Sequence, residues 1–95
     1  MLNSKQISYL RSLSHNLSPV VFIGNKGVTP AVLNEIELSI KAHELIKIQI
    51  QENSKEKRTN SQNLICQKIN AQAINLIGKQ IIIYKANEKT QIILP

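Results

Sequence analysis

Residues 20–33, which read VVFIGNKGVTPAVL, decide the fold. The first four are β-branched or aromatic and lie between a proline and a glycine, so Val20–Ile23 is predicted to form a short buried strand. Thr29 and Pro30 predict the start of a helix, because threonine can accept backbone N–H bonds at the cap and proline suits the first helical position. A strand, a tight turn and a helix are therefore expected in direct succession.

The turn between this strand and helix has the sequence Gly-Asn-Lys-Gly, residues 24–27. Gly24 and Gly27 allow positive φ and let a phosphate approach without meeting a Cβ atom. The following helix presents free N–H groups and a positive dipole end, and Lys26 adds a mobile cation. A phosphate grip is one interpretation, and an ordinary strand-to-helix turn is the other. The Walker phosphate loop and the dinucleotide fingerprint are both absent from the sequence.

Apolar residues on either side of this stretch follow regular periods. Upstream, leucine and isoleucine recur at helical spacing from Ser4 to about Leu17, which predicts a first helix. Downstream, the helix that starts at Pro30 gives way to period-two alternation. Ile46, Ile48 and Ile50 would face one side of a second strand, with Lys47 and Gln49 on the other.

The second half of the chain predicts a helix and a hairpin. Residues 52–60 are polar and are expected to form a loop that runs into a third helix, with Leu64, Ile65 and Ile69 on its inner face. Asn70 is a residue that can end this helix in the left-handed conformation.

Two strands, 73–77 and 80–85, are expected to pair through Gly78-Lys79, because glycine suits the first position of a type II′ turn. Residues 91–94 form a last extended stretch that could add to a sheet edge. The element order is α-β-α-β-α-β-β over residues 1–95, which predicts one α/β (α+β) domain with a small sheet covered by helices.

Charge is distributed unevenly along the chain, whose net charge is +6. Residues 1–30 carry three bases and no acid, residues 31–56 carry five acids against three bases, and residues 57–95 carry six bases against one acid. A basic surface with an acidic strip suggests that one side meets a polyanion. Charge that serves only solubility is the alternative.

The titratable side chains do not form a recognisable catalytic or metal-binding pattern. Neither His15 nor His43 has a nearby Cys or Ser in a nucleophile pattern, and Cys66 is the single cysteine and is expected in the core or at its edge. The glutamates of the middle segment, Glu35, Glu37 and Glu44, are expected on a solvated helix face. We therefore expect no enzyme activity, no metal, no cofactor and no small-molecule substrate. No signal peptide or membrane-length apolar run is present, so a soluble cytoplasmic protein is expected.

Several segments together carry a family resemblance. LRSLSHNLSPVVFIGNKGVTPAVLNEIELSIKAHELIKIQI (10–50) and INLIGKQIIIYK (74–85) closely resemble the CRM domain, the RNA-binding domain shared by chloroplast splicing factors and the bacterial YhbY proteins. The similarity runs over nearly the whole chain, and the chain's size is similar to that of the stand-alone bacterial members. The resemblance implies a small four-stranded mixed sheet packed with helices, similar to the C-terminal domain of translation initiation factor three.

The resemblance also implies a function and the residues that perform it. The implied function is binding of ribosomal RNA in precursors of the large (50S) ribosomal subunit and assistance in their assembly. The residues carried over are those of the glycine loop, the adjacent strand and the neighbouring basic surface: Gly24, Asn25, Lys26, Gly27, Thr29, Lys47, Arg11, Lys5 and Lys85.

Two questions stay open at this stage. Lys55, Lys57 and Arg58 could extend the RNA footprint or could simply be solvated. A protein-interaction adaptor that uses the acidic second helix or a sheet edge is the alternative function. The expected state is a monomer without membrane contact.

Overall fold

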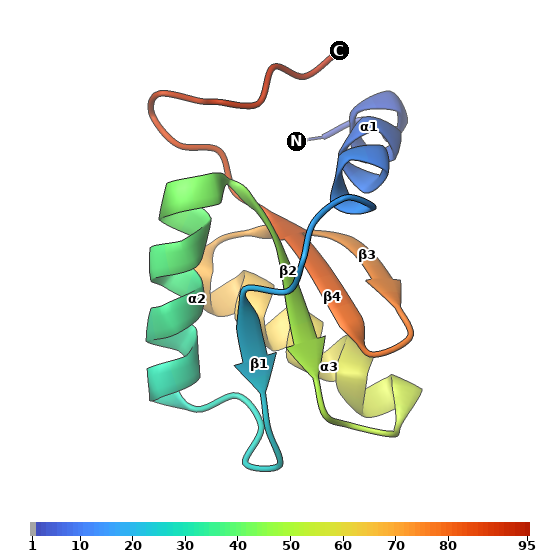
Figure 1. Ribbon diagram of the computed structural model, residues 1–95, viewed down its shortest axis with the longest axis vertical. Coiled ribbons are helices and arrows are strands. Elements are labelled where there is room, and N and C mark those ends of the chain that lie inside the picture. The colour runs from blue at the N-terminus through green and yellow to red at the C-terminus, as the bar shows by residue number, and fades with distance from the viewer. Residues whose placement is uncertain (1) are drawn as a thin grey trace.

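Three helices and four strands follow one another in the predicted order (Figure 1). The computed structural model describes residues 2–95. The elements are α1 (Ser4–Ser14), β1 (Val21–Ile23), α2 (Pro30–His43), β2 (Leu45–Ile50), α3 (Lys55–Ile69), β3 (Gln72–Ile77) and β4 (Gln80–Tyr84).

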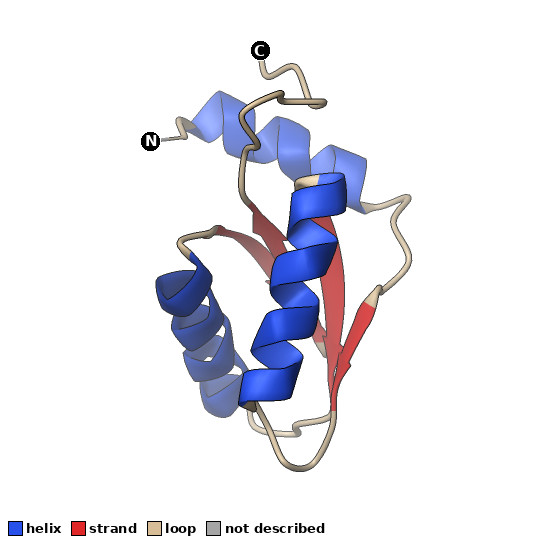
Figure 2. Ribbon diagram, turned by 90° about the vertical axis from the view of Figure 1, so that its left-hand side faces the viewer, coloured by secondary structure: helices blue, strands red, loops and turns tan. Residues whose placement is uncertain are grey.

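The four strands form one mixed sheet in the order β1-β2-β4-β3. β1 and β2 are parallel and are joined through α2, whereas β4 runs antiparallel to both of its neighbours. Helices α2 and α3 lie side by side on one face of the sheet, and α1 crosses the end where β2 begins (Figure 2). The expected α+β fold with a four-stranded mixed sheet is therefore confirmed.

Alternation along the strands gives the sheet two apolar faces of unequal size. The larger core, beneath α2 and α3, is made almost entirely of isoleucine and includes Ile46, Ile48 and Ile50 of β2. The smaller core lies beneath α1, where Leu10 packs against Leu45 and other apolar side chains of the sheet. Because α1 covers only part of its face, the end of the sheet near the β1–α2 turn stays open on that side.

Local signals explain most helix ends. The Asn3 side chain and Gln6 form a reciprocal capping box at the start of α1. The helix ends at Ser14, earlier than predicted, because the next residues form tighter turns, with the Leu17 N–H donating to the Ser14 carbonyl at 3.1 Å. Asn70 is left-handed (φ 58°, ψ 46°) and ends α3 as predicted.

The start of α3 and its inner face differ from the sequence expectation. Ser54 accepts the Lys57 N–H, so the helix begins at Lys55, inside the stretch predicted to be a loop. Leu64 is 39 % exposed, whereas Gln62 is buried and donates to the Asn75 carbonyl at 2.7 Å. A β-bulge in β3 lies between Ala73 and Asn75 and interrupts its pairing with β4, so Gln62 satisfies a carbonyl near the interruption.

The position of Glu44 differs from the sequence expectation of a solvated helix face. It is completely buried at the junction of α2 and β2, in the left-handed region at φ 66°, and does not lie on a solvated face. Its carboxylate accepts the backbone N–H groups of Asn87 (2.8 Å), Gln91 and Ile92 (3.0 Å). These bonds fix the C-terminal segment above α2, so residues 91–94 are held as irregular chain, and the predicted edge strand is wrong.

Gly78 has φ 55° between the paired residues Ile77 and Gln80, as the predicted hairpin turn requires. Among residues 2–95, no helix has the length and apolar character needed to cross a bilayer.

Candidate nucleic-acid interface

The Gly24–Gly27 loop projects from the end of β1, at the tip of the molecule's long axis (Figure 1). The Gly27 N–H donates to the Gly24 carbonyl at 3.0 Å and closes the turn, and Gly27 has φ 73°. Asn25 and Lys26 are exposed between the two glycines. Glycine is therefore required by conformation at Gly27, whereas Gly24 does not have positive φ.

Both glycines face open space. A Cβ atom built on Gly24 or Gly27 would meet no atom within 4 Å among the described residues. A ligand can therefore approach the loop backbone without displacing any part of the protein. This geometry fits a phosphate contact, and it also means that a side chain at Gly24 would sit where such a ligand must lie.

The start of α2 orients this loop. Thr29 is the N-cap, and its hydroxyl oxygen accepts the Val32 N–H at 3.2 Å, while Pro30 occupies the first helical position. Proline has no N–H and Val32 is already bonded, so in the first turn the N–H of Ala31 is the donor left for a ligand. The helix end thus contributes its dipole and one donor beside the loop.

The connection from β2 to α3 and the turn between β3 and β4 both lie beside the glycine loop. The Gln51 N–H donates to the Ile23 carbonyl at 2.8 Å, and the Ile50 N–H donates to the Lys79 carbonyl at 2.9 Å. These bonds tie the ends of β1 and β2 to the β3–β4 turn. We call this region, made of residues 22–30, 51–57 and 78–79, the loop end of the molecule.

The loop end carries four exposed lysines and two acids. The lysines are Lys26, Lys55, Lys57 and Lys79. The Glu52 carboxylate accepts the Ser54 N–H at 3.1 Å, and this bond, with the nearby charge of Lys57, holds the pKa of Glu52 below its ordinary value. The acid therefore bonds back toward α3, and the balance of exposed charge at this end is positive.

Arg58 lies beside these lysines but serves the protein backbone. Its guanidinium donates to the carbonyls of Glu52 at 2.8 Å and Asn53 at 3.0 Å. The group therefore fixes the connection between β2 and α3. Of the three residues left open by the sequence, Lys55 and Lys57 are exposed and available, and Arg58 is engaged.

Other predicted contacts lie away from the loop end. The Lys85 ammonium donates to the Ile69 carbonyl at 2.8 Å and thus caps α3 at the opposite end of the sheet. Arg11 donates its Nε–H to the Ile74 carbonyl at 3.0 Å, at the bulge of β3. Lys5 is exposed on the first turn of α1. The structure does not bring these three residues together with the glycine loop.

Lys47 lies between the glycine loop and α1. It lies on β2, on the sheet face that α1 partly covers, and only 8 % of it is exposed. With His43 and Asn16 it lines an apolar groove of 470 Å³ between α1, the start of β2 and the C-terminal segment. It therefore faces the same side of the sheet as the open area beside the loop, but lies nearer to α1.

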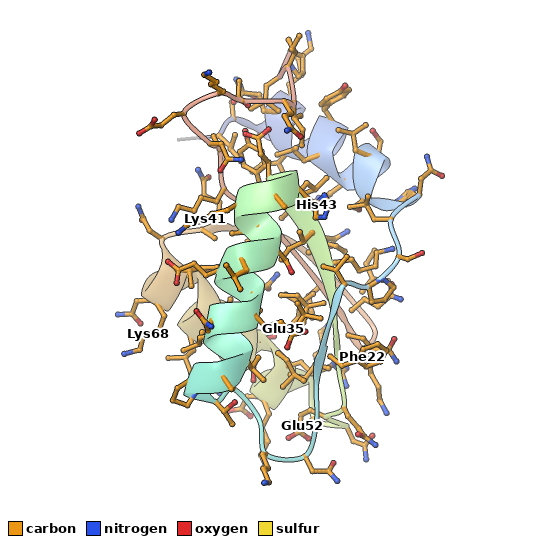
Figure 3. The ribbon with its side chains drawn as sticks, turned by 60° about the vertical axis from the view of Figure 1, so that its left-hand side comes forward. Phe22, Glu35, Lys41, His43, Glu52 and Lys68 are labelled. Carbon is orange, nitrogen blue, oxygen red and sulfur yellow. The ribbon has the colours of Figure 1, made fainter. Side chains whose placement is uncertain are left out.

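Two residues at the loop end were not predicted. Phe22 is 66 % exposed, although its strand was expected to be buried, and Lys79 lies beside it in a recess of 320 Å³. Figure 3 shows Phe22 pointing away from α2. The signal was present in the sequence, because inward-facing Val21 and Ile23 must leave the residue between them on the other face.

Comparison with known proteins bears on these features. The family model described as CRS1 / YhbY (CRM) domain matches residues 2–85. The chain belongs to this CRM family. A relative from Haemophilus influenzae, named "RNA-binding protein", is 36 % identical over 94 residues, covering 99 % of this chain and 95 % of the relative. "Probable RNA-binding protein YqeI" of Bacillus subtilis is 33 % identical over 96 residues and covers both chains completely.

A solved structure agrees with the CRM assignment. The solution structure of the Staphylococcus aureus protein SAV1595 matches with a TM-score of 0.88 and 31 % sequence identity, and the match covers all of both chains. Among the described residues 2–95, no cluster of three or more His, Cys, Asp or Glu side chains could hold a metal ion. Burial raises the pKa of the Cys66 thiol to about 11, which makes it a poor nucleophile.

Proposed function

We propose that this CRM protein binds RNA through its loop end and assists assembly of the large ribosomal subunit by associating with precursor particles. In this proposal it acts as a cytoplasmic monomer without catalytic activity. The observation that carries the proposal is the glycine loop, which combines open backbone, an exposed lysine and a helix N-terminus. Relatives named as RNA-binding proteins support the choice of ligand.

The loop contacts the RNA backbone in this proposal. Gly24 and Gly27 admit a phosphate, Asn25 and Lys26 donate to it, and Thr29 holds α2 in place beside it. Lys55, Lys57 and Lys79 add charge around the same phosphates. Such contacts position RNA without reading its sequence, so shape and unpaired segments would set the target.

The basic residues farther from the glycine loop have different proposed roles. Arg11 and Lys85 are bonded to backbone carbonyls, and we assign them to stability. Lys47 could meet RNA that continues along the open sheet face, and Lys5 could meet only a ligand that reaches α1. The proposed footprint is therefore smaller than the resemblance alone implied.

Sedimentation of a cell lysate at low salt tests the proposal. The variant is Gly24→Asp combined with Lys26→Glu, because Gly24 has ordinary backbone angles and both positions are exposed. Gly27→Asp is less suitable, since an aspartate at φ 73° adds strain. The matched control is Lys41→Glu combined with Lys68→Ala, which lowers the net charge by three, as the loop variant does, at two exposed lysines near the C-terminal ends of their helices (Figure 3).

We expect the wild type and the control to sediment with large-subunit precursors and the loop variant to stay at the top of the gradient. If the wild type stays at the top, the assembly role is wrong. If both double variants leave the particles equally, the interaction depends on total charge and the loop is not the grip.

The adaptor alternative is tested in the same lysate. The exposed Leu38 on α2, 63 % accessible, is the feature that would favour a protein partner. Retention of a partner at high salt after nuclease treatment, lost in Leu38→Ala, would replace the RNA proposal with the adaptor.

A further inference from the structure

Phe22 is the chain's single phenylalanine, and it lies two-thirds exposed in the middle of a strand. Its neighbours Val21 and Ile23 are 1 % exposed and pack into the isoleucine-rich core. The alternation of the strand therefore holds the Phe22 ring on the sheet face opposite α2 and α3. Packing into this core explains Val21 and Ile23, whereas the Phe22 ring takes no part in it.

The ring forms one wall of a recess of 320 Å³ whose other lining residues are Gln49, Ile50, Gln51 and Lys79. Gln49 is the register partner of Phe22 across the parallel β1–β2 pair. The recess therefore combines an aromatic face, two amide side chains that can both donate and accept, and one ammonium. No acidic side chain of the described residues lines it.

This combination suits a nucleobase better than an aliphatic or acidic side chain. Every base has a flat π-face that can stack on an aromatic ring, and its edge carries donors and acceptors that amides can pair. The ammonium of Lys79 suits the phosphate attached to such a base. An aliphatic side chain would use the ring but leave the glutamines and the lysine without partners.

The recess lies next to the proposed phosphate grip. Phe22 precedes Gly24 by two residues, a separation of about 7 Å along an extended chain. The bond from the Ile50 N–H to the Lys79 carbonyl holds the lysine turn at the same end of the sheet. An RNA strand that has one phosphate bound at the glycine loop can therefore place a neighbouring base on the Phe22 ring.

We infer that Phe22 is the stacking site for one unpaired nucleobase of the bound RNA. This inference rests on the proposed function and adds a ligand preference to it. A base inside a duplex is already stacked on its neighbours and cannot lie on Phe22. The protein should therefore favour RNA in which a single-stranded segment adjoins the contacted phosphates.

The chain contains no tryptophan, so a tryptophan introduced at the site is a unique fluorescent reporter. Phe22→Trp keeps an aromatic ring, and Leu38→Trp provides the control at a similarly exposed position, 63 % accessible, on α2. The probes are an RNA hairpin with a short single-stranded overhang and the same hairpin with a blunt end. We expect the overhang RNA to quench the indole fluorescence of the Phe22→Trp variant and to leave that of the Leu38→Trp variant unchanged.

Affinity measurements separate stacking from charge. Phe22→Ala should weaken binding of the overhang RNA about 5- to 150-fold, the loss typical of one stacked base, while leaving the salt dependence unchanged. Phe22→Tyr should restore most of the affinity. Blunt hairpin RNA should bind the wild type and Phe22→Ala about equally.

Two results would overturn the inference in distinguishable ways. If the wild type binds both RNAs in a salt-dependent manner but neither quenching nor a Phe22→Ala effect appears, the stacking site is wrong and the RNA proposal stands. In the second result, the wild type binds neither RNA, and the fluorescence of the Phe22→Trp variant changes only when a nuclease-treated protein fraction is added. The proposed function then fails together with the inference.

Discussion

Lys26 is the single cation at the tip of the glycine loop, and its proposed contribution to RNA binding can be measured separately. Lys26→Ala should weaken binding modestly and reduce the slope of log affinity against log salt by about one, because one fewer phosphate is neutralised. Lys41→Ala, in the last turn of the 14-residue helix α2 that follows the loop, is the matched control. Filter binding at several salt concentrations gives both slopes, and equal slopes would rule out a phosphate contact by Lys26.

Glu44 should control stability, particularly in acid. Burial alone would raise the pKa of its carboxyl, but the hydrogen bonds from Asn87, Gln91, Ile92 and the Thr90 side chain outweigh it and hold the pKa below the ordinary value of 4.5. A carboxyl whose pKa is lowered on folding stabilises the folded state above about pH 4.5 and loses that contribution as pH falls through the lowered value.

The variant Glu44→Gln tests this directly. It should lower the free energy of unfolding at neutral pH by roughly 1–3 kcal/mol, because a neutral amide cannot accept all the bonds that the carboxylate accepts. The difference from the wild type should narrow in acid. Denaturant unfolding at pH 7 and pH 3 measures both effects, with Glu35→Gln on the exposed face of α2 as control. A constant difference across pH would contradict the role of the charge.

Thr29 lies at the junction between the glycine loop and α2, and its effect on stability can be separated from its effect on RNA binding. Thr29→Ala removes the bond to the Val32 N–H and should cost about 1 kcal/mol, whereas Thr29→Ser should preserve most of the stability. Thermal unfolding measures the first effect. RNA binding well below the unfolding temperature should change little in either variant, since the threonine acts by holding the helix start.

At the same scale, the sequence predicted the existence of every helix and strand, because their periods and caps are local. It could not predict that Glu44 is buried, since its bonding partners lie 43 to 48 residues away. The bulge of β3 is likewise a property of strand pairing, so the sequence did not predict that Gln62 would be buried near it while Leu64, expected on the inner face, is exposed. The start of α3 was missed although its cap, Ser54, was visible in the sequence.

At the scale of the whole molecule, the glycine loop could be predicted because its strand, turn and helix cap are contiguous in the sequence. Lys79 was not, because only the sheet order β1-β2-β4-β3 brings the hairpin turn beside β1 and β2. The same topology carries Lys85 to the opposite end. A list of basic residues therefore does not define a surface until the strand order is known.

The two ends of the molecule's 37 Å long axis have different proposed roles. The loop end holds the glycine loop, Phe22 and the exposed lysines, and substitutions of Phe22 or of these lysines should change binding with little effect on stability. The other end holds α1, Glu44 and the C-terminal segment, where substitutions should have the opposite effect.

The bonds of Glu44 also bear on how the protein matures during translation. The carboxylate is synthesised 43 to 48 residues before the N–H groups that it binds. At 5–20 residues per second, roughly 2–10 s pass before those partners exist. The nascent domain must therefore wait with this charge hydrated, and its α2–β2 junction can close only after the sheet and the segment behind it have emerged.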